Sequence, residues 1–187
     1  MKAKKDKIVT KQNIKSNNNV SVRIKDKELH RITTTTLVYK PDFTYLITKR
    51  ALHKKSHPGK WTIPGGGLTV DDYINTPQSE HGENLWYNVL EKSLKREIKE
   101  ETDLEIGKPE LLVDLTFIRP DGIPVICLSC FTPYISGEVS IDQDPEGDTV
   151  DFAWVTLEEA KKYDLIGGIW DEIRQVDEIL KSRLNSR

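Results

Sequence analysis

From residue 31 onward, the pattern of apolar and polar positions first predicts β-strands. The run Arg31–Tyr39 is β-branched and aromatic, and Pro41-Asp42 supplies a turn into a second such run at residues 44–48, so the two runs predict a hairpin. A short strand beginning at Trp61 then leads into Gly65–Gly67. Three consecutive glycines permit backbone conformations and close approaches that other residues do not.

The apolar spacing changes to a helical period in the middle of the chain. After a polar loop at residues 69–82, Leu90, Leu94 and Ile98 recur four positions apart and predict a helix over about residues 83–102. Leu90, Leu94 and Ile98 form its apolar stripe, which we expect to face the body of the domain.

The second half of the chain returns to strands and closes with a helix. Residues 111–118 and 123–131 predict two strands joined by a tight turn, and residues 152–156 predict another. Thr156 with Glu159 has the spacing of a capping box. Residues 169–184 repeat at the helical period and predict a helix packed on the sheet. The order of elements favours an α/β (α+β) fold, a mixed sheet with helices on its faces.

Composition sets the size and class of the protein. The chain has 187 residues, 36% of them hydrophobic and 31% charged, with a net charge of −2. This length suits one domain, and the charge gives no general attraction to nucleic acid or membrane. No apolar run is long enough to span a bilayer and the N-terminus lacks a signal-peptide core, so we expect a cytoplasmic protein.

The first 27 residues differ from the rest of the chain. They are rich in Lys and Asn and poor in large apolar side chains, apart from a short stretch at residues 20–24. We predict that residues 1–27 form a basic, mobile tail ending in a short added strand, and that residues 28–187 form the single domain. A basic arm that binds an acidic partner is the alternative.

The two cysteines form a lone C-x-x-C within a predicted strand. Cys127 and Cys130 lie three positions apart, and residues at that spacing face opposite sides of a sheet. They can neither bridge nor readily share a metal, so we expect structural thiols.

Three carboxylates share one face of the predicted central helix. Glu97, Glu100 and Glu101 are related by helical spacing, and like charges held so close raise one another's pKa unless a cation lies between them. A solvated acidic face is the alternative, but Glu91, Lys92, Lys95 and Lys99 already occupy the solvent sector. Carboxylate oxygens suit Mg²⁺ or Mn²⁺.

The segment at residues 49–60 is dense in cations and ends in a Pro-Gly turn. By itself it would be a solvated loop. Beside an acidic metal site, it would supply the positive charge that a polyphosphate needs.

Three motifs together resemble the Nudix hydrolase family. They are Trp61-x-x-Pro64-Gly65-Gly66-Gly67, Arg96-Glu97-Ile98-x-Glu100-Glu101-x-x-Leu104 and Trp154-Val155-x-Leu157-Glu158-Glu159. The resemblance covers about residues 31–163. It implies an α/β/α sandwich around a mixed β-sheet and Mg²⁺- or Mn²⁺-dependent hydrolysis of a diphosphate linked to another moiety, commonly a nucleoside. A metal-activated water would attack phosphorus.

The same resemblance assigns roles to residues of this chain. Glu97, Glu100 and Glu101 would bind the metal, Arg96 would hold the glutamates by hydrogen bonds, and Gly65 and Gly66 would shape the loop that places the helix. The general base would be one of these glutamates or an acid of the following loop, namely Glu146, Asp148 or Asp151. Candidates for phosphate contacts are Arg50, Lys54, Lys55 and Lys60, and those for stacking on a base are Trp61, Phe117 and Tyr45, each of which packing explains as well.

Two positions depart from the family pattern. The family pattern contains a Glu that follows a Gly after five intervening residues and precedes the Arg by seven intervening residues. Counting back from Arg96 places Asn88 at the position of this Glu. Since Gly65–Gly67 lie well upstream, we expect an insertion between turn and helix, with Glu83 as the replacement acid. Asp103 stands where the family usually has Gly, and Asp tolerates the left-handed conformation of a helix end at modest cost.

Two other functions remain as alternatives. The stretch Lys55-Ser56-x-Pro58-Gly59-x-Trp61 is similar to isopentenyl-diphosphate isomerases, but the Cys and His expected after the Trp are absent from residues 62–64. A non-catalytic Nudix-fold nucleotide sensor would not need all three glutamates. The expected partner is therefore a small nucleotide or other diphosphate, and a homodimer is left open.

Overall fold

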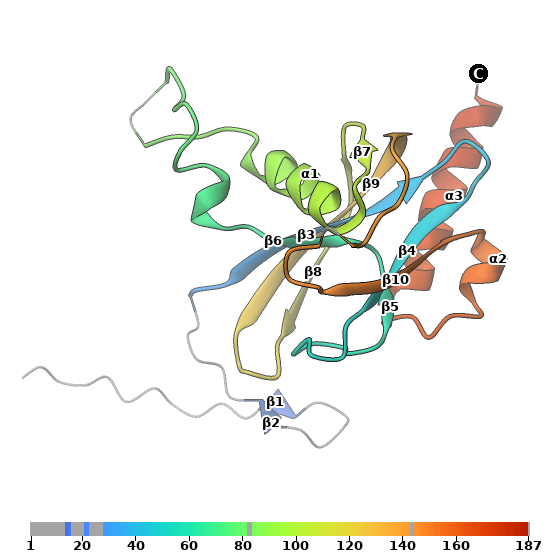
Figure 1. The fold of residues 1–187 in the computed structure, drawn as a ribbon, viewed down its shortest axis with the longest axis horizontal. Coiled ribbons are helices and arrows are strands. Elements are labelled where there is room, and N and C mark those ends of the chain that lie inside the picture. The colour runs from blue at the N-terminus through green and yellow to red at the C-terminus, as the bar shows by residue number, and fades with distance from the viewer. Residues whose placement is uncertain (1–13, 16–20, 23–27, 82–83, 143, 187) are drawn as a thin grey trace, which may run out of the picture.

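An eight-stranded mixed sheet forms the centre of the molecule (Figure 1). The computed structural model describes residues 14–15, 21–22, 28–81, 84–142 and 144–186. The main path of the sheet runs β10 (Thr149–Val155), β4 (Tyr45–Arg50), β3 (Arg31–Tyr39), β9 (Pro124–Ser136) and β7 (Glu105–Ile106). In addition, β5 (Trp61–Thr62) pairs with β4, β6 (Gly65–Gly67) with β3, and β8 (Glu110–Ile118) with β9. The β3–β9 ladder is parallel and the other ladders of this sheet are antiparallel.

Helices cover both faces of this sheet. Successive residues of a strand point to opposite faces, so Leu37 of β3 packs with Ile173 of α3 (Ile169–Asn185), whereas Val38 packs with Leu94 of α1 (Val89–Thr102). The short helices are η1 (Val70–Asp72) before α1 and α2 (Leu157–Ala160) before α3. The layers form the predicted α/β/α sandwich. Over the described part of the chain, no helix has both the length and the apolar character needed to cross a membrane.

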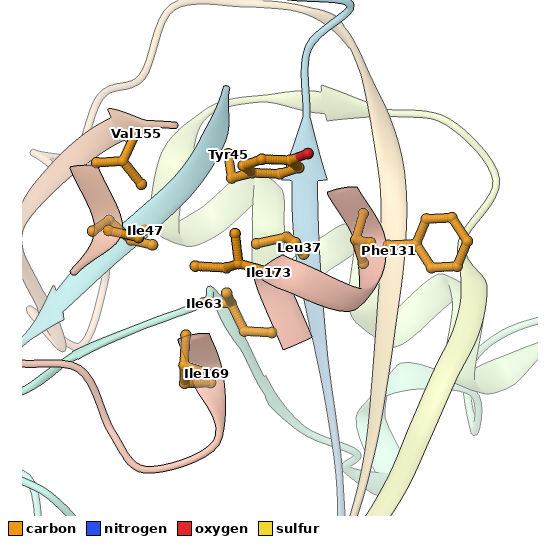
Figure 2. Close-up of a cluster of buried hydrophobic side chains, with 10 residues drawn as sticks. Leu37, Tyr45, Ile47, Ile63, Phe131, Val155, Ile169 and Ile173 are labelled. Atoms are coloured by element: carbon orange, nitrogen blue, oxygen red, sulfur yellow. The ribbon is translucent and has the colours of Figure 1, made fainter. Parts of the chain in front are cut away.

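The larger core lies between the sheet and α3. Figure 2 shows side chains of β3, β4, β9, β10 and α3 converging there, among them Leu37, Tyr45, Ile47, Phe131, Val155, Ile169 and Ile173. Burial of each such side chain contributes about 1.5–3 kcal/mol, so this contact fixes the sheet relative to α3.

Most of the predicted elements form near their expected positions. The turn after β8 closes through a hydrogen bond from the Arg119 amide to the Ile123 carbonyl, as expected. The capping box at α2 is complete, because Thr156 Oγ1 accepts from the Glu159 amide and Glu159 accepts from the Thr156 amide. The strand predicted at residues 123–131 is longer than expected, and β7 was not predicted.

The prediction for the start of the central helix was wrong. The helix begins at Val89 rather than near residue 83, because Asn88 adopts the left-handed conformation with φ of 58°. Trp86 packs on Tyr73 with ring centroids 5.2 Å apart and donates from Nε1 to the Thr76 carbonyl, which holds the preceding segment in a loop. The end of the helix agrees with expectation, since Asp103 takes the left-handed conformation with φ of 57°.

The cysteines lie on opposite faces of β9, as the spacing predicts. Cys127 is buried near α3, and Cys130 packs against the cluster beneath α1. Both are free thiols, and burial raises the pKa of Cys130 to about 11. A disulfide between them is absent.

Near the N-terminus, β1 (Ile14–Lys15) and β2 (Ser21–Val22) form an antiparallel two-stranded ladder. The strand expected at residues 20–24 therefore pairs with β1 in a sheet separate from the main one. Residues 1–13, 16–20 and 23–27, on which the prediction of a mobile tail rests, lie outside the described residues, so that prediction is untested.

Removing the Tyr45 hydroxyl should destabilise the fold. This hydroxyl donates to Asp177 Oδ1 at 3.0 Å within the core, and burial together with Asp177 raises the pKa of Tyr45. Tyr45→Phe leaves a buried carboxylate oxygen without its partner, which costs about 1–3 kcal/mol. Urea denaturation measures the loss. Tyr134→Phe is the control, because its hydroxyl bonds the Gly137 carbonyl at the surface, and an equal loss in both variants would contradict the prediction.

Candidate active site

The guanidinium of Arg96 lies at the centre of the acidic helix face. It donates from Nη1 to Glu100 Oε2 at 2.7 Å, from Nη2 to Glu97 Oε1 at 2.9 Å and from Nε to Asp72 Oδ1 at 2.6 Å. One cation therefore orients three carboxylates on two elements, α1 and η1. This is the geometry expected for Arg96, with Asp72 as an additional partner.

The glycine strand β6 contacts the other side of the glutamates. The Gly65 amide donates to Glu101 Oε2 at 2.9 Å. The Gly66 backbone lies against Glu97, so closely that a Cβ at Gly66 would fall 2.2 Å from Glu97 Cδ. A side chain at Gly66 would therefore displace Glu97, whereas a side chain at Gly65 would meet the Thr34 carbonyl oxygen and one at Gly67 would meet the Arg31 guanidinium.

The negative charge of the carboxylates on α1 is only partly compensated by nearby cations. Burial raises the pKa of Glu97 although Arg96 opposes the shift. Burial also raises the pKa of Glu101 to about 8, with the charges of Glu97 and Asp144 adding to the effect. A divalent cation would relieve this repulsion, and oxygen donors suit Mg²⁺ or Mn²⁺. The residues therefore fit such an ion, although no group of three or more ligands is preassembled among the described residues.

Asp72 is the site residue that counting back from Arg96 missed. Five residues separate Gly66 from Asp72, the spacing that the family has between its Gly and Glu, so counting forward from Gly66 finds it. Asp72 also accepts from Ser93 Oγ at 3.0 Å. The insertion follows Asp72 and lies between the glycine turn and the helix, as expected, and the count that leads to Asn88 does not find this partner of Arg96. Glu83, the other candidate, lies outside the described residues.

A cavity of about 730 Å³ opens beside β6. The charged side chains that line it are Arg31, Arg50, Lys54, Lys55, Arg119, Glu146, Asp148 and Glu172. Its lining also includes the backbone of Gly65–Gly67 and the apolar side chains of Leu115, Phe117, Cys127 and Ile169. Glu97 and Glu101 of α1 contact β6, the strand that forms the cavity wall, whereas Glu100 is held by Arg96. None of these three glutamates is among the residues that line the cavity.

The predicted phosphate-binding cations are placed differently from one another. Arg50 is anchored by a hydrogen bond from Nε to the Ser56 carbonyl, and burial lowers its pKa while the charge of Glu101 opposes this. Lys54 pairs with Asp148, and Lys55 is 72% exposed and 3.9 Å from Asp121. Lys60 pairs with Asp164 and does not line the cavity.

Some of the candidate general bases and candidate stacking residues line the cavity and others do not. Glu146 and Asp148 line the cavity, whereas Asp151 does not. Burial tends to raise the pKa of Asp148, but hydrogen bonds with Lys54 and His53 hold it below its usual value. Of the aromatic residues, Phe117 lines the cavity. Tyr45 is buried in the core and Trp61 packs edge-on against Tyr163, with ring centroids 4.7 Å apart.

Comparison with known proteins decides the family. Residues 29–174 match the NUDIX domain. The chain belongs to the Nudix family. It is 30% identical over 138 residues to the nucleoside triphosphatase NudI of Escherichia coli K12, covering 66% of this chain and 81% of NudI. Against NudI of Klebsiella pneumoniae it is 29% identical over 135 residues, covering 65% and 79%. The chain is a Nudix-type pyrophosphohydrolase.

Solved Nudix structures share the fold. A MutT NUDIX hydrolase from Burkholderia pseudomallei superposes with a TM-score of 0.60 at 20% identity, covering 80% of this chain and 99% of that one. The NUDIX domain of Shewanella oneidensis NrtR, solved with ADP ribose, gives a TM-score of 0.60 at 17% identity, covering 82% and 90%. At these identities the comparison concerns the fold alone.

Alanine at the two glycines should have different consequences. At Gly65, φ is 142° and a Cβ would fall 2.2 Å from the Thr34 carbonyl oxygen, so Gly65→Ala should destabilise the fold by about 1–3 kcal/mol or more. At Gly66 the obstacle is the Glu97 carboxylate, which can rotate away. Gly66→Ala should therefore unfold near the wild-type midpoint but lose about 100-fold in kcat/KM. Denaturation and kinetics measure both, and a destabilised Gly66→Ala variant with normal activity would contradict the assignment.

Asp72 should make stability depend on pH. Burial opposes its ionisation, but hydrogen bonds from Arg96, Thr69 and Ser93 outweigh this and hold its pKa below the usual value. The stabilisation is therefore complete above the unfolded-state pKa of about 4 and is lost as pH falls through the folded-state pKa. Urea denaturation of Asp72→Asn should show a deficit at pH 7 that shrinks below about pH 4. A deficit that is constant from pH 7 to pH 3 would contradict this prediction.

Proposed function

We propose that this pyrophosphohydrolase cleaves a nucleoside di- or triphosphate derivative in a reaction that depends on Mg²⁺ or Mn²⁺. The observation that carries the proposal is the array of Glu97, Glu100 and Glu101, held by Arg96 and β6 beside a cavity with cations. The NudI relatives act on nucleoside triphosphates by name, and the NrtR domain was solved with ADP ribose, which supports a nucleotide substrate.

The glutamates of α1 are assigned to the metal ion. Glu97, Glu100 and Glu101 would hold it, and Asp72 would act through Arg96 as a positioning residue. When bound, such an ion neutralises charge on phosphoryl oxygens and lowers the pKa of a bound water. Arg96 already offsets part of the repulsion among the carboxylates, so the array keeps its geometry before substrate arrives.

The cations in the cavity are assigned to the phosphates. Arg50 is fixed by the Ser56 carbonyl, whereas Lys54 is paired with Asp148. A phosphate oxygen that binds Lys54 in place of Asp148 would free Asp148 Oδ2 to accept a proton from the attacking water, while Oδ1 keeps its contact with His53. Glu146, which lines the same cavity, is the other candidate for that role. Lys55 lies at the exposed rim and suits the outermost phosphate.

A substrate panel tests the proposal. Nucleoside triphosphates, dinucleoside polyphosphates, ADP-ribose, NADH, nucleotide sugars and CoA would each be incubated with Mg²⁺ or Mn²⁺, and released phosphate or pyrophosphate measured. We expect at least one nucleotide to be cleaved, Glu100→Gln and Glu101→Gln to reduce kcat by 100-fold or more, and chelation of the metal to abolish the reaction.

Glu91→Gln is the matched control for this experiment. It makes the same change on the same helix, but Glu91 faces solvent and pairs with Lys95 at 2.8 Å, so its activity should equal that of the wild type. Asp148→Asn and Glu146→Gln locate the base, because only loss of the base flattens the acidic limb of the pH–rate profile. Nucleotide binding without any metal-dependent cleavage would instead identify a nucleotide sensor. Cytoplasmic location and homodimer formation stay predictions.

A further inference from the structure

The cavity contains one carboxyl group that the proposed chemistry does not use. Glu172 of α3 lines the cavity, and its Oε2 is hydrogen-bonded to Ser129 Oγ of β9. Ser129 is 1% exposed, so this contact is fixed by the sheet. Among the described residues, no Lys, Arg or His forms an ion pair with Glu172, and Ser129 is the one hydrogen-bond partner that its side chain has.

The surroundings of Glu172 make a carboxyl group costly there. Leu115 and its register partner Cys127, which is two residues from Ser129, line the same cavity with Ile169. Burial raises the pKa of Glu172 although Ser129 opposes the shift. A carboxyl without a cation in such a place lowers stability unless it meets a polar partner. Oε1 has no partner within the described part of the chain, so it remains available to a ligand.

The sheet register gives the separation of Ser129, which contacts Glu172, from Gly65, which contacts Glu101. Ser129 of β9 lies opposite Thr35 of β3, and Thr35 lies opposite Gly65 of β6. Neighbouring strands are about 4.8 Å apart, so Ser129 and Gly65 are separated by about 10 Å. Gly65 bonds Glu101, and therefore a molecule whose phosphate lies beside β6 can reach Glu172 with a group about one nucleoside away.

We propose that Glu172 is the specificity residue of this enzyme and selects nucleobases that carry an exocyclic amino group. This inference rests on the proposed function, because it assumes that a nucleotide occupies the cavity. Oε1 accepts a hydrogen bond from the amino group of cytosine, adenine or guanine.

The selection holds when Glu172 is ionised or is protonated on Oε2, whereas a proton on Oε1 would make that oxygen a donor and reverse the preference. When the carboxyl is ionised, Ser129 Oγ donates to Oε2 and Oε1 is an acceptor. When it is protonated on Oε2, that proton is donated to Ser129 Oγ and Oε1 is the carbonyl oxygen, which is again an acceptor. A base with a carbonyl in place of the amino group brings two acceptors together and is disfavoured.

A structural role is the competing explanation. Asp171 and Glu172 both lie in the first turn of α3, where acidic side chains favour the helix N-terminus, and the bond to Ser129 could serve only to hold α3 on β9. In that case, changing Glu172 would alter stability without altering the choice of base.

Matched pairs of ligands separate the two explanations. CMP and UMP differ at the 4-substituent and in the N3 proton that accompanies it, whereas GMP and IMP differ only in the 2-amino group. Their binding to the full-length protein can be measured by calorimetry without any hydrolysis. We expect the wild type to favour the amino member of at least one pair by about tenfold, because an unpaired acceptor in a hydrogen-bonding site is strongly rejected. Glu172→Gln, whose amide can donate or accept, should reduce that ratio to about twofold or less.

Glu178→Gln is the control for the substitution. It lies on the same helix, pairs with Arg174 at the surface at 2.9 Å, and should keep the wild-type ratio. Equal ratios in the wild type and Glu172→Gln, whatever the unfolding midpoints, would overturn the inference. The hydrolysis rates of CTP and UTP, and of GTP and ITP, then distinguish failure of the proposed function from failure of the role of Glu172. A binding preference without hydrolysis overturns the proposed function alone, and hydrolysis without a preference overturns the role of Glu172 alone.

Discussion

The electrostatic repulsion among the carboxylates on α1 is the constraint on which the arrangement of the candidate active site depends. Three glutamates on one helical face would separate or protonate if nothing balanced them, and the Arg96 guanidinium balances two of them through its planar fork. The third, Glu101, is held by a backbone amide that carries no full charge. The array is thus arranged but not neutralised, which is the state that favours uptake of a cation.

The α/β/α sandwich fixes where the glutamates of α1 lie relative to the rest of the site. Alternate residues of β3 anchor α1 on one face of the sheet and α3 on the other, so the glutamates and Glu172 belong to different helices but are related through one row of strand residues. Because that row runs through hydrogen-bonded strands, the separation of Ser129 and Gly65, which contact Glu172 and Glu101, does not depend on the loops. Loops at residues 51–60 and 144–148 then add the charged groups of the cavity.

The sequence predicts the parts of the site that depend on periodicity. Leu94 and Ile98 are buried under α1 as their spacing requires, and this places Glu97 and Glu101 at the edge of the same face. The start of α1 was not predictable in this way, because packing of Trp86 on Tyr73 decides it. Closure of the basic loop likewise decides that Arg50 enters the cavity and Lys60 does not. Glu172 carries no sequence signal, since an acid in the first turn of a helix is ordinary.

The ion pair between Asp72 and Arg96 has a consequence for how the motif can vary. Residues 73–95 separate the two partners, where the family pattern has seven positions, yet they meet at 2.6 Å. Closing a loop about three times longer costs only about 1 kcal/mol in chain entropy. The segment before α1 projects away from the sheet (Figure 1), so its length does not disturb the core. The contact between Asp72 and Arg96 is therefore kept although the intervening chain is longer. The chain between these two residues is a place where new structure can be added.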